Sequence, residues 1–319
     1  MRLVRTLTLA AVCAGAALAA TAGADEGKVS VDPDLWTYTK VPQALEGNLN
    51  SVGSDTMNNL VTLWAEGFAR HYPGVRVQVE GKGSSTAPPA LIEGTAQFGP
   101  MSRAMKDKEV DAFEEKFGYK PTQLKTSMDA LAVFVHRDNP LRGLTMTQVD
   151  SIFSSTRKRG GGEVGTWGDL GLTGDWATKP INLYGRNSAS GTYGFFKDTA
   201  LNKGDFKDSV KEQPGSAAVV QGVTEDLYAV GYSGVNMVPL GEDSASMFEA
   251  NMTNVVDGTY PLGRFLYLYV NKAPNKQATP LVREFVRFVF SREGQEIVVK
   301  DGYLPLDERM CAKMRALVD

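Results

Sequence analysis

Apolar and polar positions follow one another along the chain in blocks that predict strands and helices. Residues 49–52 and 75–79 have the pattern of short strands, and residues 57–71 between them carry apolar side chains at helical spacing. The same order returns later, where a strand at 181–184 precedes a helical segment from about 192 to 201. This order favours an α/β fold built on open sheets.

Two strongly apolar runs, residues 131–135 and 265–270, stand far apart and enclose a middle segment. Such runs are typical of strands that are covered on both faces. We therefore predict two lobes, one inserted into the other, with the chain crossing between them twice at a hinge. One large doubly wound sheet is the alternative. The predicted divisions are a lead-in at 25–47, lobe I at 48–135 and 261–319, and lobe II at 136–260.

The N-terminal segment has the three parts of a secretory signal peptide. Residues 1–5 are basic, residues 7–20 are apolar and rich in alanine, and residues 22–24 are small. We therefore assign residues 1–24 to a cleaved signal peptide and expect a secreted, periplasmic protein. Anchoring through a lipid on Cys13 is the alternative. No later run reaches the roughly 20 apolar residues of a spanning helix.

Charge and rare residues exclude several classes of function. The chain has 319 residues and a formal net charge of −3, and loss of Arg2 and Arg5 with the signal peptide lowers this to −5. An acidic chain without a long basic run argues against nucleic acid as a partner. Cys311 is then the single cysteine and cannot form an internal disulfide. His71 and His136 belong to no metal-ligand cluster, so we expect no metal and no other cofactor.

The candidate chemistry centres on residues 185–192, a loop rich in Gly and Ser between a strand and a helical segment. Such a loop directs backbone N–H groups at one point, and a helix N-terminus adds partial positive charge there. Arg186 precedes the hydroxyls of Ser190 and Thr192, and its planar guanidinium suits a tetrahedral oxyanion. The segment therefore predicts an anion site. The alternative is an ordinary helix cap beside a solvated arginine.

Three further polar loops have the same relation to a predicted strand. Residues 53–56 and 83–86 follow the first two strands, and Ser102 with Arg103 closes a third unit. Ligands bind open α/β sheets at the carboxyl ends of their strands. The four loops are therefore expected to meet at one site.

The order and spacing of these loops resemble the phosphate-binding subunit of Pst-type ABC importers. The likeness covers nearly all of the chain after the signal peptide, and it includes residues 129–133, 231–234, 260–264, 293–295 and 302–306. The resemblance implies a two-lobed periplasmic-binding-protein clamshell of the α/β class with a double-crossover hinge. It also implies a monomer that captures inorganic phosphate and delivers it to a membrane ABC permease.

Carried over position by position, the resemblance implies a set of phosphate contacts. The set is Ser54, Thr56, Ser84, Ser102, Arg186, Ser190, Gly191 and Thr192. Arg103 accompanies the serine before it in one branch of the family, and Ser85 is a further candidate.

One position departs from the pattern of the better-known members. They place an aspartate where this chain has Ser102, and that carboxylate accepts the proton that bound phosphate still carries. Here Asp55 and Asp129 are the candidates for the acceptor. Their alternative roles are a helix N-cap for Asp55 and a turn or hinge partner of a backbone amide for Asp129. A mismatched acceptor costs about 1 to 3 kcal/mol or more in a dry site, so the acceptor controls selectivity against sulfate.

Other functions remain as alternatives. The same fold could bind arsenate, sulfate, tungstate or a phosphate ester, of which arsenate matches phosphate best in size and protonation, or could serve signalling without transport. A phosphoryl-processing enzyme is disfavoured because the chain has no P-loop. A nucleophile elbow at Ser190 would also need glycines where Ser188 and Thr192 stand. We therefore assign no catalytic residues.

Overall fold

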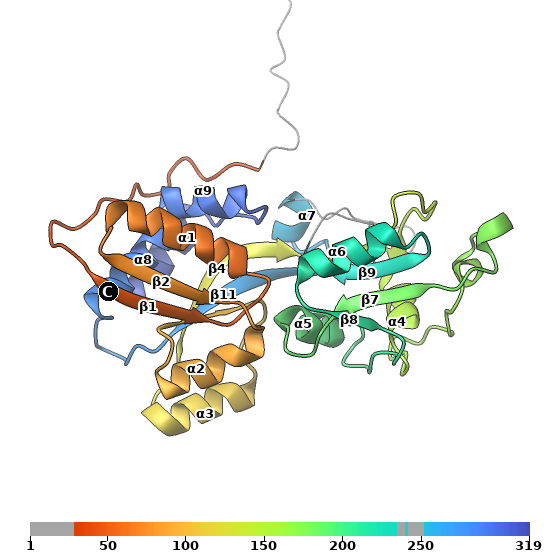
Figure 1. The fold of residues 1–319 in the computed structure, drawn as a ribbon, viewed down its shortest axis with the longest axis horizontal. Helices are drawn as coiled ribbons and strands as arrows, with labels where there is room; N and C mark the ends of the chain where they lie inside the picture. Colours follow the sequence, from red (N-terminus) through yellow and green to blue (C-terminus); the bar gives the residue numbers. More distant parts are fainter. Residues whose placement is uncertain (1–28, 235–239, 242–251) are drawn as a thin grey trace, which may run out of the picture.

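The computed structural model describes residues 29–234, 240–241 and 252–319. The expected signal peptide and the start of the lead-in lie outside these residues. The described part contains a five-stranded, a four-stranded and a two-stranded sheet, and the two larger ones are separate, so the alternative of a single large sheet is wrong (Figure 1). None of the described helices has the length and apolar character needed to cross a membrane.

Lobe I is built on a five-stranded sheet of order β2-β1-β3-β11-β4. Its strands are β1 (Gly47–Val52), β2 (Val75–Glu80), β3 (Phe98–Met101), β4 (Thr122–Ala130) and β11 (Gly263–Val270). Strand β1 is parallel to β2 and β3, whereas β11 is antiparallel to β3 and β4. The last segment of the chain thus supplies an inner strand of the first sheet.

Helices cover both faces of this sheet (Figure 1). They are α1 (Asn58–His71), α2 (Ala87–Glu93), α3 (Asp107–Phe117), α8 (Pro280–Val289), α9 (Arg292–Lys300) and α10 (Glu308–Ala316). Side chains of α1, α8, α9 and α10 form one core, and those of α2 and α3 form another. Successive strand residues alternate in direction, so Leu268 enters the first core and Tyr269 the second.

Lobe II is built on a four-stranded sheet of order β5-β9-β7-β8. Its strands are β5 (Ala132–Val135), β7 (Asn182–Arg186), β8 (Lys211–Gln213) and β9 (Ala229–Ser233). Its other described elements are β6 (Leu144–Thr145), β10 (Leu240–Gly241), α4 (Met146–Phe153), α5 (Gly191–Thr199), α6 (Ser216–Glu225), α7 (Met252–Val256) and short 3-10 turns at Trp167–Leu170 and Gly174–Trp176. Phe196 of α5 stacks on Tyr232 of β9 with ring centroids 3.8 Å apart, which fixes α5 against the sheet.

The chain passes between the sheets at two adjacent points. Strand β4 ends at Ala130, and β5 begins two residues later and pairs with β9. The Leu131 amide donates to the Leu262 carbonyl at 3.0 Å, just before β11 returns to lobe I. Residues 131–135, expected in lobe I, instead belong with lobe II, because β5 pairs with β9 and Leu131 packs in the core of the second sheet. A run that is apolar throughout does not reveal which of the two cores it joins.

Candidate functional site

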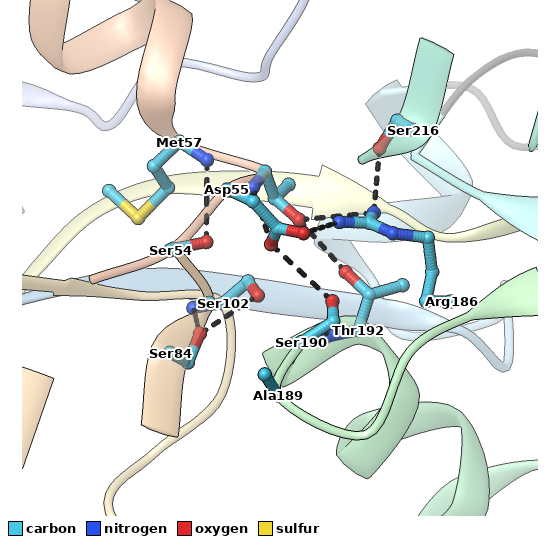
Figure 2. Close-up of polar contacts among 12 residues, drawn as sticks. Ser54, Asp55, Met57, Ser84, Ser102, Arg186, Ala189, Ser190, Thr192 and Ser216 are labelled. Carbon is cyan, nitrogen blue, oxygen red and sulfur yellow. Dashed lines mark hydrogen bonds and ion pairs between the residues drawn. The ribbon is translucent and has the colours of Figure 1, made fainter. Parts of the chain in front are cut away.

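The four predicted loops meet where the two lobes face each other (Figure 2). In lobe I they follow β1, β2 and β3, with Ser84 in a 3-10 turn at Ser84–Thr86, and in lobe II the loop joins β7 to α5. The side chains buried there are those of Ser54, Thr56, Ser84, Ser102, Arg186, Ser190 and Thr192. Residues that are far apart in the sequence thus form one polar cluster, as the loop pattern predicts.

Arg186 lies at the centre of the cluster, and its side chain is fully buried. Its guanidinium pairs with the Asp55 carboxylate and donates to the Ser216 hydroxyl at 2.8 Å and the Thr56 hydroxyl at 3.5 Å. Within the described residues its Nε–H has no hydrogen-bond partner. The alternative of a solvated arginine is therefore wrong, and one of its buried donors is left unsatisfied by the described residues.

Hydroxyl groups from the two lobes touch one another. The Thr56 and Thr192 oxygens are 2.9 Å apart across the interface, and the Ser84 and Ser102 oxygens are 3.3 Å apart within lobe I. Gly191 lies against the second pair: a Cβ atom there would stand 2.3 Å from the Ser84 Oγ and 2.5 Å from the Ser102 Oγ. Only glycine lets the α5 N-terminus approach these hydroxyls so closely.

Two serine side chains of the cluster accept backbone hydrogen bonds at the start of a helix, and one of them, Ser190, is the N-cap of α5. The Ser190 oxygen accepts from the Thr192 amide at 3.2 Å, and its hydroxyl lies 3.4 Å from the Asp55 carboxylate. The Ser54 oxygen accepts from the Met57 amide at 3.3 Å. Asp55 caps no helix, because its carboxylate accepts from the adjacent Thr56 amide and pairs with lobe II. The N-cap alternative for Asp55 is therefore wrong, whereas Ser190 is the N-cap of α5 and also lies in the polar cluster.

Asp129 has a partner that the sequence pattern did not single out. Arg264 donates to its Oδ2 from Nε at 2.9 Å and from a terminal nitrogen at 2.6 Å. The two residues are direct cross-strand partners in β4 and β11, and their side chains are 4% and 3% exposed. The partner is thus a guanidinium and not a backbone amide. Residues 260–264 carry the resemblance, but no single sequence feature reveals this pairing.

Arg103 and Ser85 lie away from the centre of the cluster. The Arg103 guanidinium forms a bidentate pair with Glu109 at 2.7 and 2.8 Å and also donates to the Ala104 carbonyl. Burial acts to raise the pKa of Glu109, but the bonds from Arg103 outweigh it and leave this pKa below its ordinary value. Ser85 is exposed and donates from its amide and hydroxyl to the Ala189 carbonyl of lobe II at 3.3 and 3.1 Å.

Two further contacts were not found by sequence reasoning. The Tyr303 hydroxyl donates to the Thr56 carbonyl at 2.8 Å, and burial raises the pKa of Tyr303, so the phenol keeps its proton. Ser216, the first residue of α6, supports Arg186 as described above. The described residues hold no group of three His, Cys, Asp or Glu that could bind a metal. The arrangement offers hydrogen-bond donors on several sides and one carboxylate, which suits a small oxyanion.

Comparison with known proteins gives a consistent picture. A family model described as a PBP superfamily domain matches residues 38–293. The phosphate-binding protein PstS of Pseudomonas aeruginosa is 56% identical over 321 residues, which cover 98% of this chain and 97% of the relative. PstS of Staphylococcus epidermidis is 28% identical over 262 residues, covering 79% of this chain and 77% of the relative.

Solved structures share the fold. A putative phosphate ABC transporter substrate-binding protein with bound phosphate from Clostridium perfringens matches with a TM-score of 0.68 and 24% identity, covering 82% of this chain and all of the other. An ABC-type phosphate transport receptor from Vibrio cholerae matches with a TM-score of 0.64 and 20% identity over 81% of this chain and all of the receptor. At these identities the structures support the two-lobed architecture.

Proposed function

Because the chain belongs to the PstS family of phosphate-binding proteins in the PBP superfamily, we propose that it closes its two lobes on one inorganic phosphate. It is exported to the periplasm, works there as a monomer and delivers phosphate to a membrane ABC permease. The relatives are named as binding proteins, which agrees with the expectation of a non-enzyme.

The observation that carries this proposal is the convergence of donors from both lobes. Lobe I contributes the hydroxyls of Ser54, Thr56, Ser84 and Ser102, and lobe II contributes Arg186, Ser190, Thr192 and the Gly191 amide at the start of α5. A phosphate dianion accepts hydrogen bonds on all sides, and each bond to a charged group contributes roughly 1.5 to 3 kcal/mol before desolvation is subtracted. Micromolar or tighter binding, about −8 kcal/mol, is the expected result.

Asp55 is the acceptor that we infer for the phosphate proton. Its carboxylate reaches across the interface to Arg186 and lies beside the Ser190 hydroxyl. Asp129 is instead held by two N–H groups of Arg264. A carboxylate at the interface can accept a hydrogen bond from the protonated oxygen of phosphate. Sulfate has no such proton, so its oxygen lone pairs would face those of the carboxylate. Arsenate carries the same proton and remains a competing ligand.

The sheet pairing supports a revised division of the chain. We propose that lobe I comprises residues 48–130 and 263–319 and that lobe II comprises residues 132–260. Leu131 and Leu262, joined by a backbone hydrogen bond, then form the two hinge crossings. Rotation about these crossings would open the contact between Asp55 and Arg186.

Isothermal titration of the chain without residues 1–24 tests the function directly. We expect tight binding of phosphate, comparable binding of arsenate and much weaker binding of sulfate. Arg186→Ala should weaken phosphate binding about 100-fold or more, because it also leaves the Asp55 carboxylate unpaired. Arg70→Ala is a matched control, since the Arg70 side chain is 64% exposed and pairs with Glu293 at the surface.

Two outcomes would contradict the proposal. If the wild-type protein gives no heat with phosphate at micromolar concentration, the ligand is another molecule. If Arg186→Ala binds phosphate as tightly as the wild-type protein, Arg186 is not part of the site. Hydrolysis of a phosphate ester at a rate that tracks protein concentration would favour the enzyme alternative.

A further inference from the structure

Arg264 is the second buried arginine of the cluster, and it differs from Arg186 in how its donors are used. A guanidinium has five N–H groups. Two of those of Arg264 donate to Asp129, one donates to the Ser102 carbonyl at 2.9 Å, and one donates to the Thr192 hydroxyl at 2.9 Å. Arg264 therefore has little capacity to bind a ligand itself and acts through its partners.

These partners lie on both sides of the interface. Asp129 and Ser102 belong to lobe I, whereas Thr192 belongs to the first turn of α5 in lobe II. The ring of Phe195, also in α5, lies 5.2 Å from the centre of the guanidinium. Arg264 thus reaches from the lobe I sheet to the α5 N-terminus when the lobes are together.

The contact with Thr192 fixes the direction of a hydroxyl proton. Arginine can only donate, so the Thr192 oxygen must accept from Arg264 and its own proton must point elsewhere. The nearest second partner is the Thr56 oxygen at 2.9 Å. A phosphate oxygen that enters between the two threonines would accept a hydrogen bond from the Thr192 hydroxyl.

We propose that Arg264 is a positioning residue for the bound anion: held by Asp129, it orients the Thr192 hydroxyl as a donor to phosphate. This inference rests on the proposed function. Arg264 thereby contributes to phosphate binding without contacting the anion, and Asp129 contributes by holding Arg264 in place. The selectivity between anions stays with Asp55, because phosphate and sulfate both accept from a hydroxyl.

A double-mutant cycle with calorimetric titration of phosphate tests the coupling. Arg264→Lys should weaken phosphate binding about 10- to 100-fold, because the ammonium cannot hold Asp129 and Thr192 together. Thr192→Val should cause a similar loss. The double variant should bind within about threefold of Thr192→Val alone, since Arg264 acts through that hydroxyl. The ratio of phosphate to sulfate affinity should stay unchanged in Arg264→Lys.

Phe195→Leu provides a variant that leaves every ionic partner in place. It removes the ring beside the guanidinium and should weaken phosphate binding severalfold in the wild-type background but not in Thr192→Val. Arg70→Lys serves as the control for a remote arginine. If the losses from Arg264→Lys or Phe195→Leu instead multiply with that of Thr192→Val, Arg264 has a structural role only and the inference fails. Absence of phosphate binding by the wild-type protein would overturn the proposed function as well.

Discussion

Two arginine–aspartate pairs border the candidate site, and they are built in different ways. Arg186 and Asp55 come from different lobes, and the Asp55 side chain is 12% exposed. Arg264 and Asp129 come from adjacent strands of one sheet, and both side chains are almost fully buried. The first pair exists only while the lobes touch, whereas the second forms with the sheet of lobe I. When the lobes separate, Arg186 and Asp55 lose each other and can each bind a ligand instead. Arg264 and Asp129 stay paired within the sheet and can hold neighbouring side chains in place.

The largest expected effect is the difference in the free energy of unfolding between variants of Asp129 and of Asp55. Asp129→Ala should lower the free energy of unfolding by about 3 to 5 kcal/mol, because it leaves the buried Arg264 without a counter-charge. Asp55→Ala should lower it by less than about 1 kcal/mol, because the lobes can open and let water reach Arg186. Urea unfolding in phosphate-free buffer measures both. Equal losses would mean that the two pairs do not differ as described.

The next effect concerns the approach of the lobes. Gly191→Ala should weaken phosphate binding about 100-fold, because the new Cβ would overlap the Ser84 and Ser102 hydroxyls and hold the lobes apart. Gly194→Ala is the matched control in the same helix, since its Cβ would meet the flexible Arg103 side chain at 3.3 Å. Titration calorimetry gives both affinities. Tight binding by Gly191→Ala would show that closure does not need this contact.

A smaller effect distinguishes the carboxylates by selectivity. Asp55→Asn should narrow the preference for phosphate over sulfate about tenfold or more, because the amide can donate to the unprotonated anion. Asp129→Asn should weaken both anions together and leave their ratio unchanged. Competition titrations with the two anions measure the ratio. A change of ratio in Asp129→Asn alone would transfer the acceptor role to that residue.

The smallest effect concerns Arg103, whose ion pair lies within lobe I. Glu109→Gln should lower the free energy of unfolding by about 1 kcal/mol at pH 7. The pKa of Glu109 in the folded protein lies below its ordinary value of 4.5, so its stabilisation is complete above that pH and is lost as the pH falls through the folded pKa. The wild-type protein and Glu109→Gln should therefore have the same free energy of unfolding in acid, which urea unfolding at several pH values measures. A difference that persists at low pH would assign the effect to packing.

The elements that the sequence predicts well are those with strong apolar periodicity. Helix α1 and strand β2 stand close to their expected bounds, because their less exposed positions repeat at the spacing of their class. Helices α3 and α10 were not expected: α3 buries only Phe113, and α10 only Cys311 and Met314. A helix that covers a sheet with one or two side chains gives little periodic signal.

The candidate site divides in the same way. The Gly/Ser loops could be found because each follows a strand, and a strand's end sets where its loop lies. The partners within the site could not, since Asp129 and Arg264 are separated by 135 positions and meet only through the register of β4 and β11. The partner of Arg103 could not be found either. Its guanidinium binds Glu109 of helix α3, and the loop pattern gives no sign of that pair.

The placement of β11 also bears on how the chain can be assembled. Strand β11 fills the position between β3 and β4, yet it is made after the whole of lobe II. During synthesis, the second sheet has all its strands before the first is complete. Until β11 is made, the facing edges of β3 and β4 have no partner strand, and unpaired strand edges promote aggregation. The topology itself thus requires that the sheet of lobe I is completed only when the last 60 or so residues are made, whereas lobe II can fold earlier.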